Sequence, residues 1–90
     1  MKLKYNFAVN EVAGKTVAVA VGDDAANFNG FIKMNSTGAE IFNILKNDVS
    51  LSELVAELQE IYPDQTLETL KKSAESFIGE LEKFGVLSDD

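Results

Sequence analysis

The chain has 90 residues, which suits one small domain spanning residues 1–90, and its hydrophobic content of 46% is ordinary for a folded protein. It contains neither cysteine nor histidine, which excludes disulfides and thiol nucleophiles and removes the commonest general base and metal ligand, so we expect no enzyme activity, no catalytic residue, no metal and no cofactor. The net charge is −7 and every basic residue is a lysine, whereas a nucleic-acid binder normally presents a basic face with arginines, so nucleic acid is not an expected partner.

Three runs of residues with alternating apolar side chains come first and predict strands. The runs are Lys4–Val9, Thr16–Val21 and Phe28–Met34. Segments 11–15 and 22–26, each containing a glycine, separate them as turns. Because short connections favour consecutive antiparallel strands, we expect a three-stranded antiparallel sheet in chain order, with the third run at an edge.

Helical spacing of apolar residues replaces the alternation after the third run. The predicted helices are Gly38–Lys46, a second from Leu51 that Pro63 ends, and Leu67–Phe84. Thr37 with Glu40 fits a capping box at the start of the first helix, and Ser50 with Glu53 fits one at the start of the second. Gly85 suits the end of the third. The order of elements predicts an α+β, winged-helix-like fold, with a three-stranded antiparallel sheet followed by three helices.

The distribution of apolar and charged residues bears on location and partners. No apolar run approaches the roughly 18 residues of a membrane span, and the N-terminal MKLKYNFAVN lacks the continuous apolar core of a signal peptide. We therefore expect a cytoplasmic protein with no membrane partner. The acidic imbalance falls in residues 46–90, where four lysines face eleven acids, and it is typical of a solvated surface that aids solubility.

Several stretches of the sequence resemble the PqqD family, named for pyrroloquinoline-quinone synthesis protein D. They are VAGKTVAVAVGDDAANFNGFIKMNSTGAEIFNIL, VSLSELVAELQEIYP and FIGELEKFGVL, and the resemblance covers about residues 5–88. The most specific piece is FNGFIKMNSTGAEIF, where the family typically shows a strand ending in Leu-Asn, then Thr-Gly-Ala, then an aromatic residue. This chain has Met34 for the leucine and Phe42 where tryptophan is common.

The resemblance implies a precursor-recognition element of a pathway that makes ribosomally synthesised, post-translationally modified peptides (a RiPP recognition element). Members are similar in binding the leader segment of a precursor peptide and presenting its core to a modifying enzyme, often a radical S-adenosylmethionine (SAM) enzyme. The family fold implies that the leader adds as a fourth strand along the third strand, in a groove whose other wall is the third helix. It also implies no chemistry by the domain itself.

The residues themselves are consistent with such an edge, because an uncovered strand offers unpaired N–H and C=O groups to an extended peptide. The expected peptide-binding residues of the strand are Asn29, Gly30, Phe31, Ile32 and Lys33. Those expected on the third helix are Leu67, Lys71, Ala74 and Ile78, with Lys71 at the rim able to meet an acidic leader residue.

Simpler interpretations stand beside these expectations. The helix stripe predicted to face the core contains Leu70, Ala74, Phe77, Leu81 and Phe84, and a wide core face would also take in Leu67 and Ile78. Gly30 fits a twist or packing requirement as well as close approach of a ligand. Phe31 fits an ordinary exposed residue as well as a contact with the modifying enzyme.

Three alternatives concern the whole chain. One is a small enzyme, in which carboxylates on a helix face such as Glu53 with Glu57 or Glu60 act as acids or bind a divalent ion, although acidic helix exteriors are far more often merely solvated. A winged-helix nucleic-acid-binding or regulatory module fits the same order of elements but conflicts with the acidic, arginine-free surface. A homodimer through the third strand is also open, because the edge that accepts a peptide can pair with a second copy.

Overall fold

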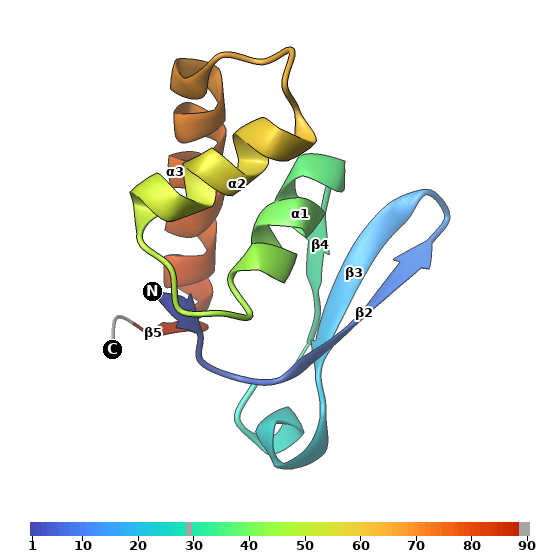
Figure 1. Cartoon of the computed structure of the whole chain (residues 1–90). Coiled ribbons are helices and arrows are strands. Elements are labelled where there is room, and N and C mark those ends of the chain that lie inside the picture. Colours follow the sequence, from blue (N-terminus) through green and yellow to red (C-terminus); the bar gives the residue numbers. More distant parts are fainter. Residues whose placement is uncertain (29, 89–90) are drawn as a thin grey trace.

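The computed structural model describes residues 1–28 and 30–88, and in it a small antiparallel sheet packs beside three helices (Figure 1). The sheet has the order β2-β3-β4. Its strands are β2 (Phe7–Val12), β3 (Lys15–Ala20) and β4 (Ile32–Met34), with a short 3-10 helix, η1 (Gly22–Ala26), between the last two. The helices α1 (Ser36–Ile44), α2 (Leu51–Ile61) and α3 (Leu67–Phe84) follow. The predicted α+β fold, with three antiparallel strands ahead of three helices, is confirmed.

A two-residue turn joins β2 to β3. Pairing runs up to Val12 opposite Lys15, so only Ala13 and Gly14 form the loop, and their φ angles are 52° and 79°. Positive φ at both central residues is the requirement of a type I′ turn, which matches the twist of the flanking strands. The predicted first strand began and ended about three residues too early, because this tight turn extends the pairing to Val12.

The third strand is shorter than predicted. The sequence pattern indicated a strand over Phe28–Met34, but β4 covers only Ile32–Met34. Gly30 has a φ of 98°, which lies outside the range of extended backbone, so a regular strand cannot continue through this residue. Phe28 instead packs its ring edge-on against the ring of Phe7, with 5.8 Å between centroids.

The helix ends follow local capping chemistry. The side chain of Asn35 accepts a hydrogen bond of 2.8 Å from the Gly38 N–H, so Asn35 is the N-cap of α1 and the predicted Thr37–Glu40 capping box is wrong. An asparagine at this position satisfies an orphan donor directly and starts the helix two residues earlier than predicted. The bounds of α3 are confirmed, and Gly85 takes the left-handed conformation at its end, with a φ of 72°.

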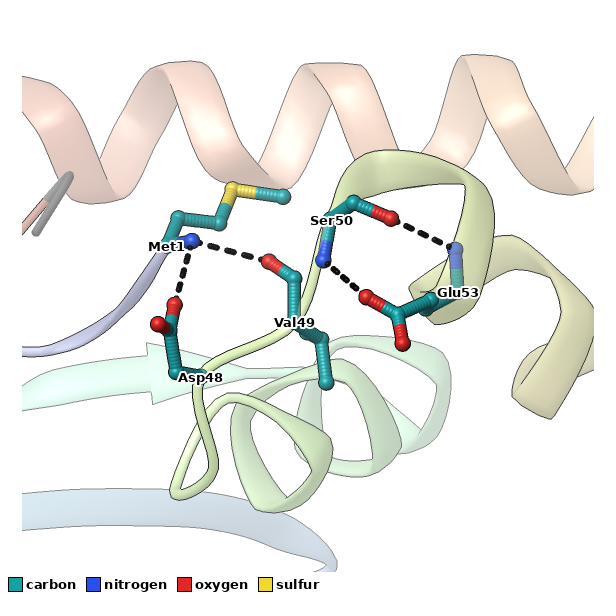
Figure 2. A network of polar contacts seen from close by, with 5 residues as sticks. All are labelled: Met1, Asp48, Val49, Ser50 and Glu53. Carbon is teal, nitrogen blue, oxygen red and sulfur yellow. Dashed lines mark hydrogen bonds and ion pairs between the residues drawn. The ribbon is translucent and has the colours of Figure 1, made fainter.

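A capping box holds the start of α2, as predicted (Figure 2). The Ser50 N–H donates to Glu53 Oε1 over 2.9 Å, and the Glu53 N–H donates to Ser50 Oγ over 3.2 Å. Hydrogen bonds from the Ser50 backbone and side chain lower the pKa of Glu53 from its ordinary value. The same view shows the Met1 amine beside this helix start, donating to Asp48 Oδ1 over 2.9 Å and to the Val49 carbonyl over 2.8 Å. That amine lowers the pKa of Asp48 through its hydrogen bond and its charge.

The two ends of the described chain form a second small sheet. Here β1 (Lys2–Leu3) pairs antiparallel with β5 (Leu87–Ser88), and the two strands lie side by side in Figure 1. The segment after Gly85 returns onto the core, since Val86 is fully buried. The pairing itself was not predicted, because two-residue strands carry no periodicity.

The core lies between one face of the sheet and the helices. Its fully buried large side chains are Phe42, Ile41, Leu45, Leu54, Leu58, Leu70, Leu81 and Val86. On β3 the small side chain of Ala18 faces this core, while Val19 on the opposite face is exposed. The predicted core stripe of α3 is right for Leu70, Ala74, Phe77 and Leu81. It is wrong for Phe84, which is 49% exposed. Within residues 1–28 and 30–88, no helix combines the length and the apolar character needed to cross a membrane.

Candidate functional site

The outer edge of β4 is the first feature of the candidate site. β4 pairs with β3 on one side, with Val17 opposite Lys33, and it is the last strand of its sheet. No strand among the described residues pairs with its other side. An edge strand directs half of its N–H and C=O groups away from its neighbour, where another chain can meet them.

A hollow of about 530 Å³ runs beside this edge, between β4, the start of α1 and α3. Its volume falls within the range of roughly 300–1,000 Å³ that is typical of ligand clefts. It is lined by Lys33, Met34, Asn35, Thr37, Gly38, Ile41, Lys72, Ser73, Ser76, Phe77 and Glu80. A second hollow of about 640 Å³ shares Lys33 and Glu80 with it and is completed by Phe31, Lys83 and Phe84. We call the two hollows together the β4–α3 groove.

Gly38 determines how closely the elements around the groove approach one another. A Cβ atom added at Gly38 would lie 3.1 Å from the Met34 Cβ and 3.1 Å from the Cε1 of the Phe77 ring. Contacts this short are tighter than packed side chains normally tolerate. The absence of a side chain therefore lets the first turn of α1 close one end of the groove against both β4 and α3.

Small and polar residues of α3 keep the groove open. Ser73 and Ser76 face it next to Phe77, which is nearly buried and belongs to the core. Since a helix turns about 100° per residue, these serines lie on one flank of the core stripe, one helical turn apart. The polar flank thus leaves room beside β4, where larger side chains would fill the space.

Two half-exposed aromatic rings mark the other end of the groove. Phe31 is 54% exposed and Phe84 is 49% exposed, and both line the second hollow. The Phe84 ring also packs edge-on against Phe28, with 6.1 Å between centroids. Phe84 therefore packs against Phe28 on one side and lines the second hollow on the other.

The strand residues that the sequence singled out fall on or near this groove. Phe31 and Lys33 line it, and Ile32 between them is 2% exposed, so its side chain belongs to the core. Gly30 precedes β4 at a bend, with open space where its Cβ would be, so its φ of 98° and not a close approach requires glycine there. Asn29 lies outside the described residues.

The helix residues that the sequence singled out do not lie beside β4. Leu67 and Lys71 line a different hollow of about 480 Å³ between α2 and α3, together with Leu51 and Val55. Ala74 is completely buried, so the expectation that it lines a groove is wrong. Ile78 packs half-buried against the core and lines neither part of the β4–α3 groove.

The sequence-based choice favoured the apolar flank of α3, whereas the groove lies on its polar flank. Ser73, Ser76 and Glu80 were missed because serine and glutamate on a helix normally indicate a solvated surface. A usable signal was present in Lys72-Ser73 and Ser76 beside the Phe77 core position, where short side chains interrupt an otherwise long-chained helix surface. No group of three or more histidine, cysteine or acidic residues in the described part of the chain could hold a metal ion.

Comparisons with known proteins were made against families, curated proteins and solved structures. A family model described as coenzyme PQQ synthesis protein D (PqqD) matches residues 7–87. No curated protein matches the chain. Among solved structures, the fold is similar to that of TbiB1 in complex with the TbiA(beta) leader peptide, with a TM-score of 0.73 and 14% identity over 100% of this chain and 98% of that chain.

Proposed function

The chain belongs to the PqqD family, and we propose that it binds the leader segment of a ribosomal precursor peptide as an extra strand along β4. The observation that carries this proposal is the uncovered edge of β4 facing the polar flank of α3 across the β4–α3 groove. An exposed strand edge alone can pair with the backbone of any extended peptide. When a helix faces that edge across a groove, the helix also contacts the side chains of the peptide and so discriminates between sequences.

The likeness to TbiB1 supports the same proposal. TbiB1 was determined in complex with the TbiA(beta) leader peptide. At 14% identity the similarity is one of fold, so it supports the capacity to bind a leader and says nothing about which sequence is bound.

In the proposed mechanism, main-chain hydrogen bonds to β4 supply affinity that tolerates many sequences. Alternate side chains of the added strand then point into the groove, against Ser73 and Ser76 on α3 and Phe31 at the aromatic end. Of the five strand residues expected to bind, we retain Gly30, Phe31, Ile32 and Lys33 in this proposal, with Asn29 as the preceding position outside the described residues.

The domain would act as a carrier and not as the catalyst. Holding only the leader leaves the core of the precursor free for a modifying enzyme, which we propose to be a radical SAM enzyme acting in the cytoplasm, where ribosomal precursors are made. Phe31 is half exposed at one end of the groove. We propose that its ring contacts the modifying enzyme when the bound peptide does not cover the ring.

Self-association is the competing use of the same edge. A second copy could pair its own β4 with the free side of β4, which would make a two-fold dimer. Because the edge accepts one strand at a time, dimer and peptide complex exclude each other in this proposal.

The first prediction concerns a variant that blocks the groove. Ser76→Trp places an indole in the space beside β4, and we expect it to weaken binding of a leader peptide at least tenfold, which is about 1.4 kcal/mol. Glu75→Trp is the matched control, because it puts the same side chain on the neighbouring, exposed position of α3, which lines neither part of the groove. The measurement is calorimetric titration with the synthetic leader of a short precursor peptide encoded beside the gene.

Amide hydrogen exchange of the same samples locates the bound strand. Binding to wild type should slow exchange within Ile32–Met34, and Ser76→Trp should remove that protection. Equal affinity of both tryptophan variants, or protection that misses β4, would show that the leader does not bind in this groove.

A further inference from the structure

The charge of the β4–α3 groove is opposite to that of the rest of the molecule. The chain carries fifteen acidic residues and eight basic ones. Three of the lysines, Lys33, Lys72 and Lys83, nevertheless line the groove, and Glu80 is the one carboxylate among its described lining residues. A local concentration of one sign in a concave site attracts ligands of the other sign.

The amino groups of these lysines are available to a ligand. Across residues 1–28 and 30–88, neither Lys33 nor Lys83 forms an ion pair within 4.0 Å. The Lys33 Nζ lies 5.7 Å from the centre of the Phe31 ring, and both residues line the second hollow. Lys72 pairs with Glu68 over 3.7 Å, but both side chains are highly exposed, and such a pair contributes little and exchanges readily.

The aromatic end of the groove calls for a different kind of side chain. Phe31 and Phe84 are both about half exposed and line the same hollow. Exposed aromatic rings gathered in a concavity are typical of a pocket for an apolar anchor residue, unlike single apolar residues scattered on a surface.

The distance between the two ends limits the spacing of the ligand's side chains. Lys72 and Phe84 both belong to α3, and at about 1.5 Å per residue their Cα atoms are separated by roughly 18 Å along the axis. An extended peptide at roughly 3.4 Å per residue crosses that distance in about five residues.

We infer that the groove selects an acidic peptide, with a carboxylate side chain at the Lys72 end and an aromatic or large aliphatic side chain about five residues away at the Phe31–Phe84 end. Lys33, which lines both hollows, lies between the two ends. This inference rests on the proposed function, since it names the class of peptide that the added strand would have. The acidic excess in residues 46–90 adds to this selection. A basic peptide would be attracted to acidic side chains outside the groove, so it would compete poorly for the groove itself.

Selection from a displayed library of random twelve-residue peptides tests the inference, with the full chain immobilised. We expect the retained peptides to be enriched in Asp and Glu over Lys and Arg, with an apolar residue about five positions from an acidic one. A parallel selection on Ser76→Trp should lose these peptides. Groove-dependent peptides that are basic or show no charge preference would overturn the inference while leaving strand addition intact. Recovery of the same peptides on wild type and Ser76→Trp would overturn the proposed function itself.

A charge exchange then assigns the contact to one lysine. Lys33→Glu should weaken binding of a selected acidic peptide roughly threefold to tenfold, and changing the acidic residue of that peptide to lysine should restore affinity for this variant. Lys46→Glu, an exposed position after the end of α1 that lines neither part of the groove, makes the same change in net charge and should leave affinity within about twofold. Equal losses in Lys33→Glu and Lys46→Glu would mean that only overall charge is sensed, and the inference would fall.

Discussion

Gly38 lies where three elements meet, and its missing side chain is what brings them together. The Cβ of Met34 is fixed to the backbone of β4, so it cannot move away from an added methyl group as the end of a long side chain could. The Oδ1 of Asn35, which caps α1, would lie 3.2 Å from the same methyl group. One residue therefore controls both the packing of the groove and the start of α1.

A prediction follows at this scale. Gly38→Ala should destabilise the fold by roughly 1–3 kcal/mol, because it over-packs a tight contact and displaces a helix cap. Gly79→Ala is the control: a Cβ there meets nothing within 4 Å, so the helix should become more stable by roughly 0.5–1 kcal/mol. Urea denaturation of both variants measures the two effects. Equal stability of Gly38→Ala and wild type would show that α1 can move away from β4 at little cost.

The helices show how far a sequence can predict an element and where the prediction stops. The bounds of α3 and the capping box of α2 were predicted correctly, because Ser50 and Gly85 act on neighbouring backbone. The shortening of β4 was not predicted, since alternation continues through Gly30 and only its backbone angle breaks the strand. Helix ends that depend on side chains close in sequence could be predicted from the sequence. Backbone conformations that depend on the surrounding fold could not.

The sequence predicted the strand side of the β4–α3 groove but not its helix side, because the helix side depends on how the elements pack. The strand side follows from being the third of three sequential strands, and Phe31 and Lys33 do line the groove, while their contact with a peptide stays a prediction. The helix side depends on which flank of α3 turns toward β4, and a helical pattern is symmetric about its core stripe. Apolar character pointed to the flank that lies beside α2, where Leu67 and Lys71 line another hollow.

Adjacent lysines on α3 separate these two flanks. Lys72 lines the β4–α3 groove and Lys71 lines the hollow beside α2. Lys72→Glu should lower the affinity for an acidic leader roughly twofold to fivefold, as expected for loss of an exposed ion pair. Lys71→Glu carries the same change in charge and should have little effect. Fluorescence titration of one labelled leader against both variants measures the difference in affinity. A larger loss of affinity in Lys71→Glu would show that the leader binds in the hollow between α2 and α3.

At the scale of the whole molecule, the start of the described chain and the start of α2 are tied together through Asp48 and Glu53. Both carboxylates have lowered pKa values, Asp48 because of the Met1 amine and Glu53 because of Ser50. A carboxylate whose pKa is lower in the folded than in the unfolded chain stabilises the fold fully when ionised in both states. That contribution is lost as the pH falls through the folded pKa.

The fold should therefore lose stability on acidification below the ordinary carboxyl values of 4.5 for Glu53 and 3.8 for Asp48. Glu53→Gln should be less stable than wild type near neutral pH, and the gap should narrow in acid, where the wild-type carboxylate is protonated as well. Urea midpoints measured across this range report the effect. A gap of constant size at all pH values would mean that Glu53 acts only through its shape and not through its charge.

The pairing of β1 with β5 also bears on the order in which the elements are connected. Lys2 lies opposite Ser88, so a short linker could close the chain into a ring near that pair. The Ala13–Gly14 turn, at the tip of the β2–β3 hairpin, then offers a place to open the ring again. The permuted molecule would keep β4, α1 and α3 in one uninterrupted stretch, so the groove depends on how these elements pack and not on where the polypeptide begins.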